Sequence, residues 1–328
     1  MPMESIYDLN VFLQPASVAV IGATERPGSW GSFIMEGLIS WNYPGKIYPV
    51  NPNANAVYGI PAFREVTDIP GPVELAVLTI PSESVEKAIR ACGLKGVIGI
   101  TIVTAGFGEA IPGGRKIETT LTEIAHSFGM RLVGPNVSGT FNLHARFSAA
   151  ASTGGRLLPT SLAAVTQGGY AFYELLASAK IRGMGVGKFI HTGNECDLTV
   201  TDFLEHFGRD PEVTAIIMYL ETIRDGSRFL DVARHITKTK PVVVHKAGRT
   251  GGGARAARSH TGALAVSKEV LSGLLSQAGV IIGNHSGPLE SQVVSDLTRE
   301  GIRIYNRIDE IACILSSLNQ YWTYRESR

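Results

Sequence analysis

Apolar runs of three to seven residues alternate with amphipathic stretches along most of this chain. In the first half the runs lie at 17–21, 46–50, 75–80, 97–103 and 131–133. Together with a stretch of helical spacing at 116–128, this alternation predicts a right-handed parallel α/β sheet. Small or turn-forming residues follow every run, so we expect the edge at the carboxyl ends of the strands to hold a ligand. Considered one at a time, each loop has an alternative explanation, in which its glycine and proline residues only form the turn between a strand and a helix.

The second half repeats the pattern. Its apolar runs lie at 162–166, 188–192, 215–220 and 242–244, with a helical stretch at 200–207. Beyond residue 283 we expect a helix at 289–298, a short strand at 302–305 and an amphipathic helix at 308–321. A chain of 328 residues fits about two domains of roughly 100–200 residues each. We therefore predict domains at 1–149 and 150–283, and a C-terminal helix-strand-helix extension at 284–328.

Composition narrows the class of protein. Net charge is +1, which gives no electrostatic reason to expect nucleic acid or an anionic membrane as a partner. No apolar run approaches the roughly 18 residues of a membrane helix, and we expect no signal peptide. The three cysteines share no metal-ligand spacing, so we expect no metal site and a reduced, cytoplasmic protein.

The segment from Pro241 to Ala265 indicates the chemistry. A short strand runs into a loop with three consecutive glycines and several arginines, which ends in Ser259-His260-Thr261-Gly262. Such a loop suits backbone N–H groups and arginines that wrap an anion. A neutral imidazole is a competent nucleophile, so His260 is a candidate carrier of a phosphoryl group. The alternative is a surface loop whose histidine precedes a helix.

Two further turns fit phosphate. The strand at 17–21 runs into a glycine-rich turn and then a helix, which is a phosphate-binding arrangement. Its spacing departs from Gly-x-Gly-x-x-Gly, and the second strand ends in Asn51-Pro52-Asn53 without an acidic residue, so NAD is disfavoured. In the second half Gln167-Gly168-Gly169 opens a helix, whose free N–H groups attract phosphate.

Glu221 lies at the carboxyl end of an apolar run, where a carboxylate is as often an ion-pair partner as a catalytic group. Seven histidines besides His260 have surroundings that indicate ordinary surface or packing roles. They are His126, His144, His191, His206, His235, His245 and His285.

The run from Val242 to Ala265, with K-A-G-R and S-H-T-G-A-L-A, resembles the phosphohistidine loop of the NDP-forming acyl-CoA synthetases. That superfamily includes ADP-forming acetyl-CoA synthetase and the alpha subunit of succinyl-CoA synthetase. The resemblance implies that His260 is phosphorylated and that Glu221, in Y-L-E-T-I-R-D-G, lies beside it and orients its ring. It also implies phosphate binding by Gln167, Gly168, Gly169, Ser259, Thr261 and Gly262. Relatives typically carry serine where this chain has Gly168, a change that removes a hydroxyl contact or enlarges the acyl pocket.

The first-half motifs G-A-T, Y-P-V-N-P, I-P-S, T-A-G-F-G-E and G-P-N-V-S-G resemble the CoA-binding domain of the same superfamily. The implied fold is a Rossmann-like CoA-binding domain followed by a flavodoxin-like succinyl-CoA-ligase domain, both with parallel sheets. The implied CoA-binding residues are Gly22, Ala23, Thr24, Arg26, Gly28, Gly31, Asn51, Pro52, Asn53, Ile80, Pro81, Ser82, Thr104, Ala105 and Gly106. Asn136, Gly139, Gly193 and Asn194 are the implied substrate pocket. Relatives often carry lysine at Asn53, and Arg26 is a possible substitute for its phosphate contact.

The resemblance implies an ADP-forming acyl-CoA synthetase that acts on CoA and a small carboxylic acid through an acyl phosphate and phosphohistidine. We recognise no ATP-grasp domain and no body of the third domain of longer relatives, so we expect an alpha-type subunit. An ATP-grasp beta subunit would bind Mg-ATP or Mg-ADP, in a heterotetramer. The rival hypothesis is a non-catalytic CoA-binding or regulatory protein that kept the fold. Gly168 and the missing third domain favour it, whereas His260 and Glu221 argue against it.

Overall fold

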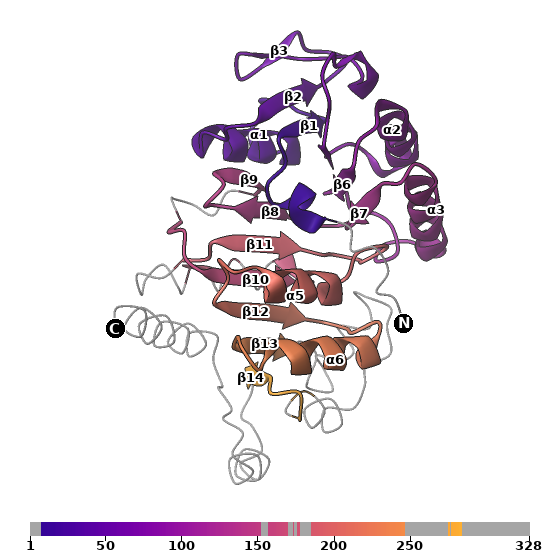
Figure 1. Cartoon of the computed structure of the whole chain (residues 1–328). Coiled ribbons are helices and arrows are strands. Elements are labelled where there is room, and N and C mark those ends of the chain that lie inside the picture. Colours follow the sequence, from indigo (N-terminus) through magenta and orange to yellow (C-terminus); the bar gives the residue numbers. More distant parts are fainter. Residues whose placement is uncertain are drawn as a thin grey trace. The chain divides into compact units, whose positions relative to one another are not determined.

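The structure is a computed structural model that describes residues 8–151, 157–169, 185–246 and 277–283, together with Tyr173, Leu176, Ala177 and Leu275. It forms two compact units, one of Met1–Ser152 with Ile190–Thr199, the other of Thr153–Phe189 with Val200–Arg328 (Figure 1). The proposed extension at 284–328 lies outside the described residues, and the predicted boundaries at 149 and 283 stay predictions.

The first unit contains the predicted parallel sheet. Its strands are β1 (Ser17–Ile21), β2 (Lys46–Val50), β5 (Leu75–Leu78), β6 (Gly99–Ile102) and β7 (Arg131–Val133), in the order β2-β1-β5-β6-β7. All neighbouring pairs are parallel. The predicted strand at 97–103 is shorter in the structure, because Val97 closes the preceding helix by donating its N–H to Cys92 O. The order of strand addition reverses between β1 and β5, which is where open α/β sheets bind ligands.

Helices and two hairpins complete this unit. The helices are α1 (Trp30–Ser40), α2 (Ser82–Lys95) and α3 (Gly114–Ser127), with short 3-10 turns η1 (Leu9–Phe12) and η2 (Val66–Asp68). The antiparallel hairpins are β3 (Ala56–Val57) with β4 (Ile60–Pro61), and β8 (Gly139–Asn142) with β9 (Phe147–Ala150). Figure 1 shows α2 and α3 side by side, and they pack against each other. The helix predicted at 116–128 is therefore confirmed, with a start two residues earlier.

The core of the first unit lies between the sheet and the pair α2 and α3. Alternate residues of one strand point to the same face of a sheet, and the residues that reach this core follow that rule. They are Ala19 and Ile21 of β1, Ala76 and Leu78 of β5, and Ile100 and Ile102 of β6. Val85, Ile89 and Cys92 of α2 and Leu121, Ile124 and Ala125 of α3 cover them. Burying a side chain of the size of valine, leucine or isoleucine contributes roughly 1.5–3 kcal/mol to stability.

The second unit is also built on parallel strands. β10 (Leu162–Thr166), β12 (Ala215–Leu220), β13 (Val242–Lys246) and β14 (Ile281–Gly283) form the order β14-β13-β12-β10. β11 (Lys188–His191) crosses the boundary between the units. Helices α5 (Val200–Arg209) and α6 (Gly226–Ile236) pack against each other, and Arg228 of α6 donates to Asp202 of α5 over 2.8 Å. Because β10, β12 and β13 are parallel, the loops that follow them leave the same edge of the sheet.

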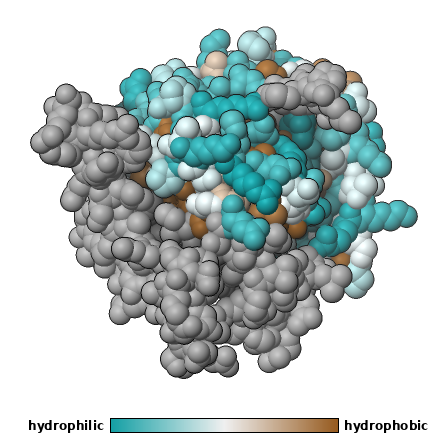
Figure 2. Space-filling model, turned by 60° about the horizontal axis from the view of Figure 1, so that its bottom comes forward, coloured by the Kyte–Doolittle hydropathy of each residue, from teal (hydrophilic) through white to brown (hydrophobic). Residues whose placement is uncertain are grey.

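Hydrophilic side chains predominate among the described residues on the face drawn in Figure 2, and apolar side chains appear there as separate spots. Scattered apolar residues of this kind are ordinary on a protein surface. In the part of the chain that the structure describes, no helix is both long enough and apolar enough to span a membrane.

Candidate active site

The predicted CoA residues after β1 and β2 are joined by hydrogen bonds. Gly22 donates its N–H to Val50 O over 3.0 Å, and the Nδ2 of Asn51 donates to Ala23 O over 2.8 Å. These bonds hold the loops after two neighbouring strands together. Within the loops, Thr24 Oγ1 accepts from the Arg26 N–H over 3.2 Å and Asn51 Oδ1 accepts from the Asn53 N–H over 2.9 Å. The side chains of Arg26, Pro52 and Asn53 are exposed.

Two glycines allow α1 to begin against the end of β1. A Cβ at Gly31 would lie 2.1 Å from Gly22 O, and one at Gly22 would lie 2.7 Å from Thr79 Oγ1. Gly22 also has a φ of +96°, in the region that disfavours other residues. Ser29 caps the helix, since its side chain accepts from the Ser32 N–H. The turn therefore presents a helix N-terminus, which favours phosphate.

Gly28 differs from its neighbours in the turn. Its φ is +77°, yet a Cβ built there meets no described residue within 4 Å. Backbone conformation, and not crowding within the chain, therefore explains glycine at this position. The open space above it suits the close approach of a ligand to the backbone.

The ends of β5 and β6 complete this edge. Thr104 donates its hydroxyl to Ile80 O over 2.6 Å, and a Cβ at Gly106 would lie 3.6 Å from Ser82 Oγ. Because β1 lies between β2 and β5, the loops after all four strands share one edge. The structure thus brings the predicted CoA residues together at the point where strand order reverses.

A network centred on Asn194 lies at the end of the loop after β6. Glu109 accepts the N–H of Gly106 over 2.5 Å and that of Phe107 over 3.2 Å. The Nδ2 of Asn194 donates to Glu109 and, over 2.6 Å, to Glu118 Oε1. Burial opposes ionisation of Glu109, but these hydrogen bonds outweigh it and lower the pKa of the carboxyl. The loop is held around an ionised carboxylate.

Three of the four predicted pocket residues lie together. Asn136 donates its Nδ2 to Asn194 Oδ1 over 3.3 Å, and Asn194 donates its N–H to Pro135 O over 3.0 Å. A Cβ at Gly193 would lie 2.3 Å from Pro135 O, so only glycine lets these loops approach. Gly139 instead begins β8, where a Cβ would lie 2.0 Å from the backbone of β9. The hairpin accounts for Gly139, and its place in a pocket stays a prediction.

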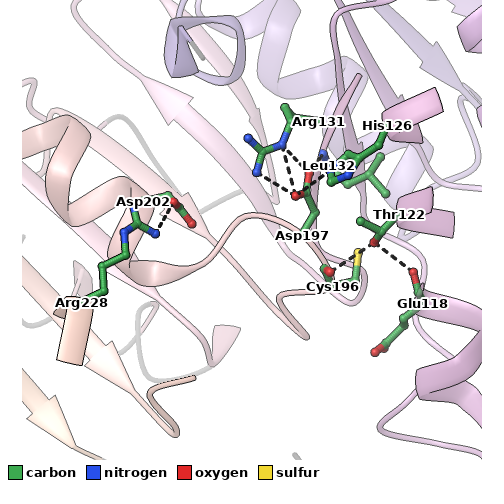
Figure 3. Close-up of polar contacts among 9 residues, drawn as sticks. All are labelled: Glu118, Thr122, His126, Arg131, Leu132, Cys196, Asp197, Asp202 and Arg228. Carbon is green, nitrogen blue, oxygen red and sulfur yellow. Dashed lines mark hydrogen bonds and ion pairs between the residues drawn. The ribbon is translucent and has the colours of Figure 1, made fainter. Parts of the chain in front are cut away.

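Asp197 anchors the segment Ile190–Thr199 to the rest of the first unit (Figure 3). Its carboxylate accepts 2.8 Å hydrogen bonds from Arg131 and from the Leu132 N–H, and a 3.1 Å contact joins it to His126 Nε2. Bidentate arginine pairs of this kind are among the strong, directional contacts in proteins. Sequence reasoning named none of Asp197, Glu109 and Glu118 as a site residue. Glu109 closes the motif T-A-G-F-G-E, but no local pattern distinguishes Asp197 and Glu118 from surface acids.

In the second unit, Gln167 and Glu221 meet at the ends of β10 and β12. The Oε1 of Gln167 accepts the N–H of Glu221 over 2.6 Å and that of Thr222 over 2.8 Å. A Cβ at Gly168 would lie 2.8 Å from Glu221 Oε1 and 2.7 Å from Tyr219 Cε1. The space left by the missing side chain at 168 is therefore filled by Glu221 and Tyr219. The enlargement of the acyl pocket by Gly168 stays a prediction.

The segment that carries the predicted nucleophile follows β13. His260, Ser259, Thr261 and Gly262 all lie outside the described residues. β13 ends at Lys246, which pairs with Leu220 of β12, so the segment begins at the edge that presents Glu221. Within β13 and β12 the rings of His245 and Tyr219 stack with centroids 5.3 Å apart, and His245 is buried. His245 is thus a packing residue, as predicted.

Cysteines and metal ligands add little to the site. Cys92 is a free thiol, and burial raises its pKa to about 12. A thiol with so high a pKa is a poor nucleophile. Among the described residues, no group of three or more His, Cys, Asp or Glu side chains could hold a metal ion.

Models of two known protein families match consecutive parts of the chain. A model of a CoA binding domain matches residues 16–141, and a model of a succinyl-CoA ligase like flavodoxin domain matches residues 159–293. The predicted order, a CoA-binding domain followed by a flavodoxin-like domain, is thereby confirmed.

Relatives and solved structures agree. The chain is 40% identical over 276 residues to subunit alpha of ADP-forming acetate–CoA ligase II of Pyrococcus furiosus, a match that covers 84% of this chain and 60% of the relative. It is 33% identical to subunit alpha of enzyme I of the same organism, with 97% and 75% covered. The solved dinucleotide forming acetyl-coenzyme A synthetase 1 of Ca. Korarchaeum cryptofilum, in complex with phosphate and ADP, matches with a TM-score of 0.79 and 36% identity, covering 86% of this chain and 60% of that one. The chain thus spans about three fifths of the first relative and of this structure.

Proposed function

Because the chain belongs to the family of ADP-forming acyl-CoA synthetases, we propose that it is an alpha-type subunit of such an enzyme. The proposed reaction interconverts acyl-CoA, phosphate and ADP with a small carboxylic acid, CoA and ATP. The observation that carries the proposal is the edge of the second unit. There Glu221 lies against Gln167 and Gly168, and the segment with His260 follows the neighbouring strand.

The chemistry proceeds in three balanced steps. A phosphate oxygen attacks the thioester carbonyl, the C–S bond breaks, and CoA leaves as an acyl phosphate forms. A ring nitrogen of His260 attacks the phosphorus, the bond to the acyl oxygen breaks, and the carboxylate leaves. The terminal phosphate of ADP then takes the phosphoryl group from nitrogen, which yields ATP and free imidazole. Histidine suits this role because neutral imidazole is nucleophilic at physiological pH.

We assign two parts of the second unit a role in the histidine steps. In the proposal the carboxylate of Glu221 accepts a hydrogen bond from the other ring nitrogen of His260, which would fix the tautomer and stabilise the developing imidazolium. Gly169 is helical, and we assign its N–H group to the phosphate. Ser259, Thr261 and Gly262 complete the proposed phosphate site.

CoA binds the first unit in this proposal. Its phosphates lie at the Gly22–Gly31 turn, its nucleotide near Asn51–Asn53, and its pantetheine arm along Ile80–Ser82 and Thr104–Gly106. The hydrogen bonds that join these loops support a common site. The acyl group is placed near Asn136 and the Gly193-Asn194 turn.

We further propose a partner. The relatives are named as alpha subunits, which supports a separate subunit for this chain. An ATP-grasp beta subunit in a heterotetramer would bind Mg-ATP or Mg-ADP and exchange the phosphoryl group with His260. The free thiol of Cys92 fits a cytoplasmic location.

Reconstitution tests the proposal. The chain is mixed with an ATP-grasp beta subunit of the family, ATP, Mg²⁺, CoA and acetate, and acyl-CoA, ADP and phosphate are measured together. We expect the three products in equal amounts, and an acid-labile phosphoryl adduct on the chain when CoA is left out. CoA binding by calorimetry without any adduct would favour the rival, a CoA-binding or regulatory protein.

A further inference from the structure

The side chain of Gln167 is committed to the backbone after β12. Its Oε1 accepts from two consecutive amides, those of Glu221 and Thr222, over 2.6 and 2.8 Å. Its own N–H donates to Tyr219 O over 3.0 Å, and its Nε2 approaches Thr222 Oγ1 at 3.5 Å. With 6% of its surface exposed, Gln167 is buried. These contacts fix the turn that follows β12 and starts at Glu221.

The two amides need the oxygen of Gln167 as an acceptor because β12 ends just before them. Backbone N–H groups that are withdrawn from water need acceptors, and an unmade hydrogen bond there costs about 1–3 kcal/mol. β12 ends at Leu220, so the next two amides lie beyond its ladder. One carbonyl oxygen with two lone pairs serves both amides.

Gly168 supplies the second half of the arrangement. A Cβ at this position would lie 2.8 Å from Glu221 Oε1, closer than real Cβ atoms approach an oxygen. The carboxylate therefore lies against the main chain of residue 168, in space that a side chain would take. Gln167 holds the backbone of Glu221 while Gly168 leaves room for its carboxylate.

We propose that Gln167 is a positioning residue, which acts through its carbonyl oxygen to place Glu221, and that its side chain is not a phosphate ligand. The proposal rests on the proposed function, which gives Glu221 its task beside His260. Phosphate is then held by backbone N–H groups at Gly168 and Gly169, and Gln167 contributes through Glu221. This assignment replaces the phosphate contact that the sequence resemblance implied for the Gln167 side chain.

Two substitutions separate the roles, because both remove the side-chain N–H donor but only Gln167→Glu keeps the oxygen acceptor. Gln167→Glu keeps two oxygen acceptors but has no N–H with which to bind phosphate, whereas Gln167→Met keeps the size and removes the acceptor. A positioning role predicts that the glutamate variant is phosphorylated faster than the methionine variant. A phosphate-ligand role predicts the reverse, since glutamate adds a negative charge beside the anion. Gln14→Glu, at an exposed position, is the control for the added charge.

Two readouts apply to the full chain. Hydrogen exchange by NMR should show the amides of Glu221 and Thr222 protected in the wild type and in Gln167→Glu, and exchanging about tenfold faster or more in Gln167→Met. Intact mass spectrometry after incubation with acetyl phosphate gives the rate of phosphorylation, which should fall at least about tenfold in Gln167→Met.

Each outcome is informative. Protected amides in Gln167→Glu with no phosphorylation, while Gln14→Glu behaves as the wild type, would overturn the proposal, and this holds even if Gln167→Met does not fold. Unchanged exchange in folded Gln167→Met would also overturn it. A wild-type chain that takes up no phosphoryl group would instead count against the proposed function, and the exchange data would still decide whether Gln167 holds the turn.

Discussion

Asn194 donates a 2.6 Å hydrogen bond from its Nδ2 to Oε1 of Glu118, a residue 76 positions earlier in the chain. The same amide nitrogen donates to Glu109, so one side chain joins two carboxylates. Glu118 is 4% exposed, and a buried carboxylate is tolerated only with donors around it. Asn194 therefore ties the loop after β6 to α3 and to Asn136.

Replacing Asn194 should destabilise the first unit. Asn194→Ala removes a donor from both carboxylates, and we expect the free energy of unfolding to fall by about 1–3 kcal/mol. Asn194→Asp should cost more near neutral pH, because it brings a third carboxylate to the cluster. Urea unfolding measures both, with Asn55→Ala at an exposed position as the control. Equal stability of Asn194→Ala and the control would show that the network contributes nothing.

Glu109 predicts a pH dependence of stability. The hydrogen bonds from Gly106, Asn194 and Phe107 lower its pKa from the usual 4.5, despite the opposing effect of burial. A lowered folded-state pKa gives stability that is present above pH 4.5 and is lost as the pH falls through the folded value. Glu109→Gln should flatten the unfolding free energy against pH below 4.5. Parallel curves for the variant and the wild type would exclude this contribution.

Gly28 and Gly59 form a matched pair for testing the CoA site. Their φ values are +77° and +74°, and within the described part of the chain a Cβ at either has no neighbour within 4 Å. Valine at either position should therefore cost similar stability through backbone strain. Only Gly28 lies in the turn proposed for the CoA phosphates, so only Gly28→Val should weaken CoA binding, by about tenfold or more. Calorimetry with CoA measures the difference, and equal affinities would place the phosphates elsewhere.

Much of the fold could be predicted from the local pattern of apolar residues. The strands at 17–21, 46–50 and 215–220 are confirmed because each is an apolar run bounded by residues that end strands. Parallel pairing then brings their loops to one edge, so Gly22, Asn51 and Thr104 could be grouped before any coordinates. The motif positions needed no knowledge of side-chain packing.

Contacts between residues that are distant in sequence could not be predicted from local pattern. No period of apolar residues in the segment Ile190–Thr199 indicates that it packs with the first unit, because its anchor is the pairing of Asp197 with Arg131, 66 positions away. Only the family resemblance grouped Gly193 and Asn194 with Asn136. The consequence of Gly168 was also hidden, because it depends on where the side chains of Tyr219 and Glu221 lie. Such features arise from tertiary packing, which no period in the sequence encodes.

The catalytic pair provides the test of the proposed mechanism. His260→Ala should abolish phosphoryl capture from acetyl phosphate, because the proposed nucleophilic nitrogen is gone. Glu221→Gln should leave CoA affinity intact and slow phosphorylation by about 10²–10⁴, since the amide keeps the shape but not the charge that stabilises imidazolium. Intact mass spectrometry follows the adduct, with His235→Ala, an exposed histidine, as the control.

Combining the two changes separates a shared role from independent ones. Once His260 is removed, Glu221 has no ring to orient, so the double variant should be no worse than His260→Ala alone. If Glu221 acted on the phosphate directly, His260→Ala would still consume acetyl phosphate slowly. Adding Glu221→Gln would then lower that remaining rate further. A phosphoryl adduct that persists in His260→Ala would place the nucleophile on another residue. The mechanism would then fail at its first covalent step on the protein, whereas CoA binding by the first unit would be unaffected.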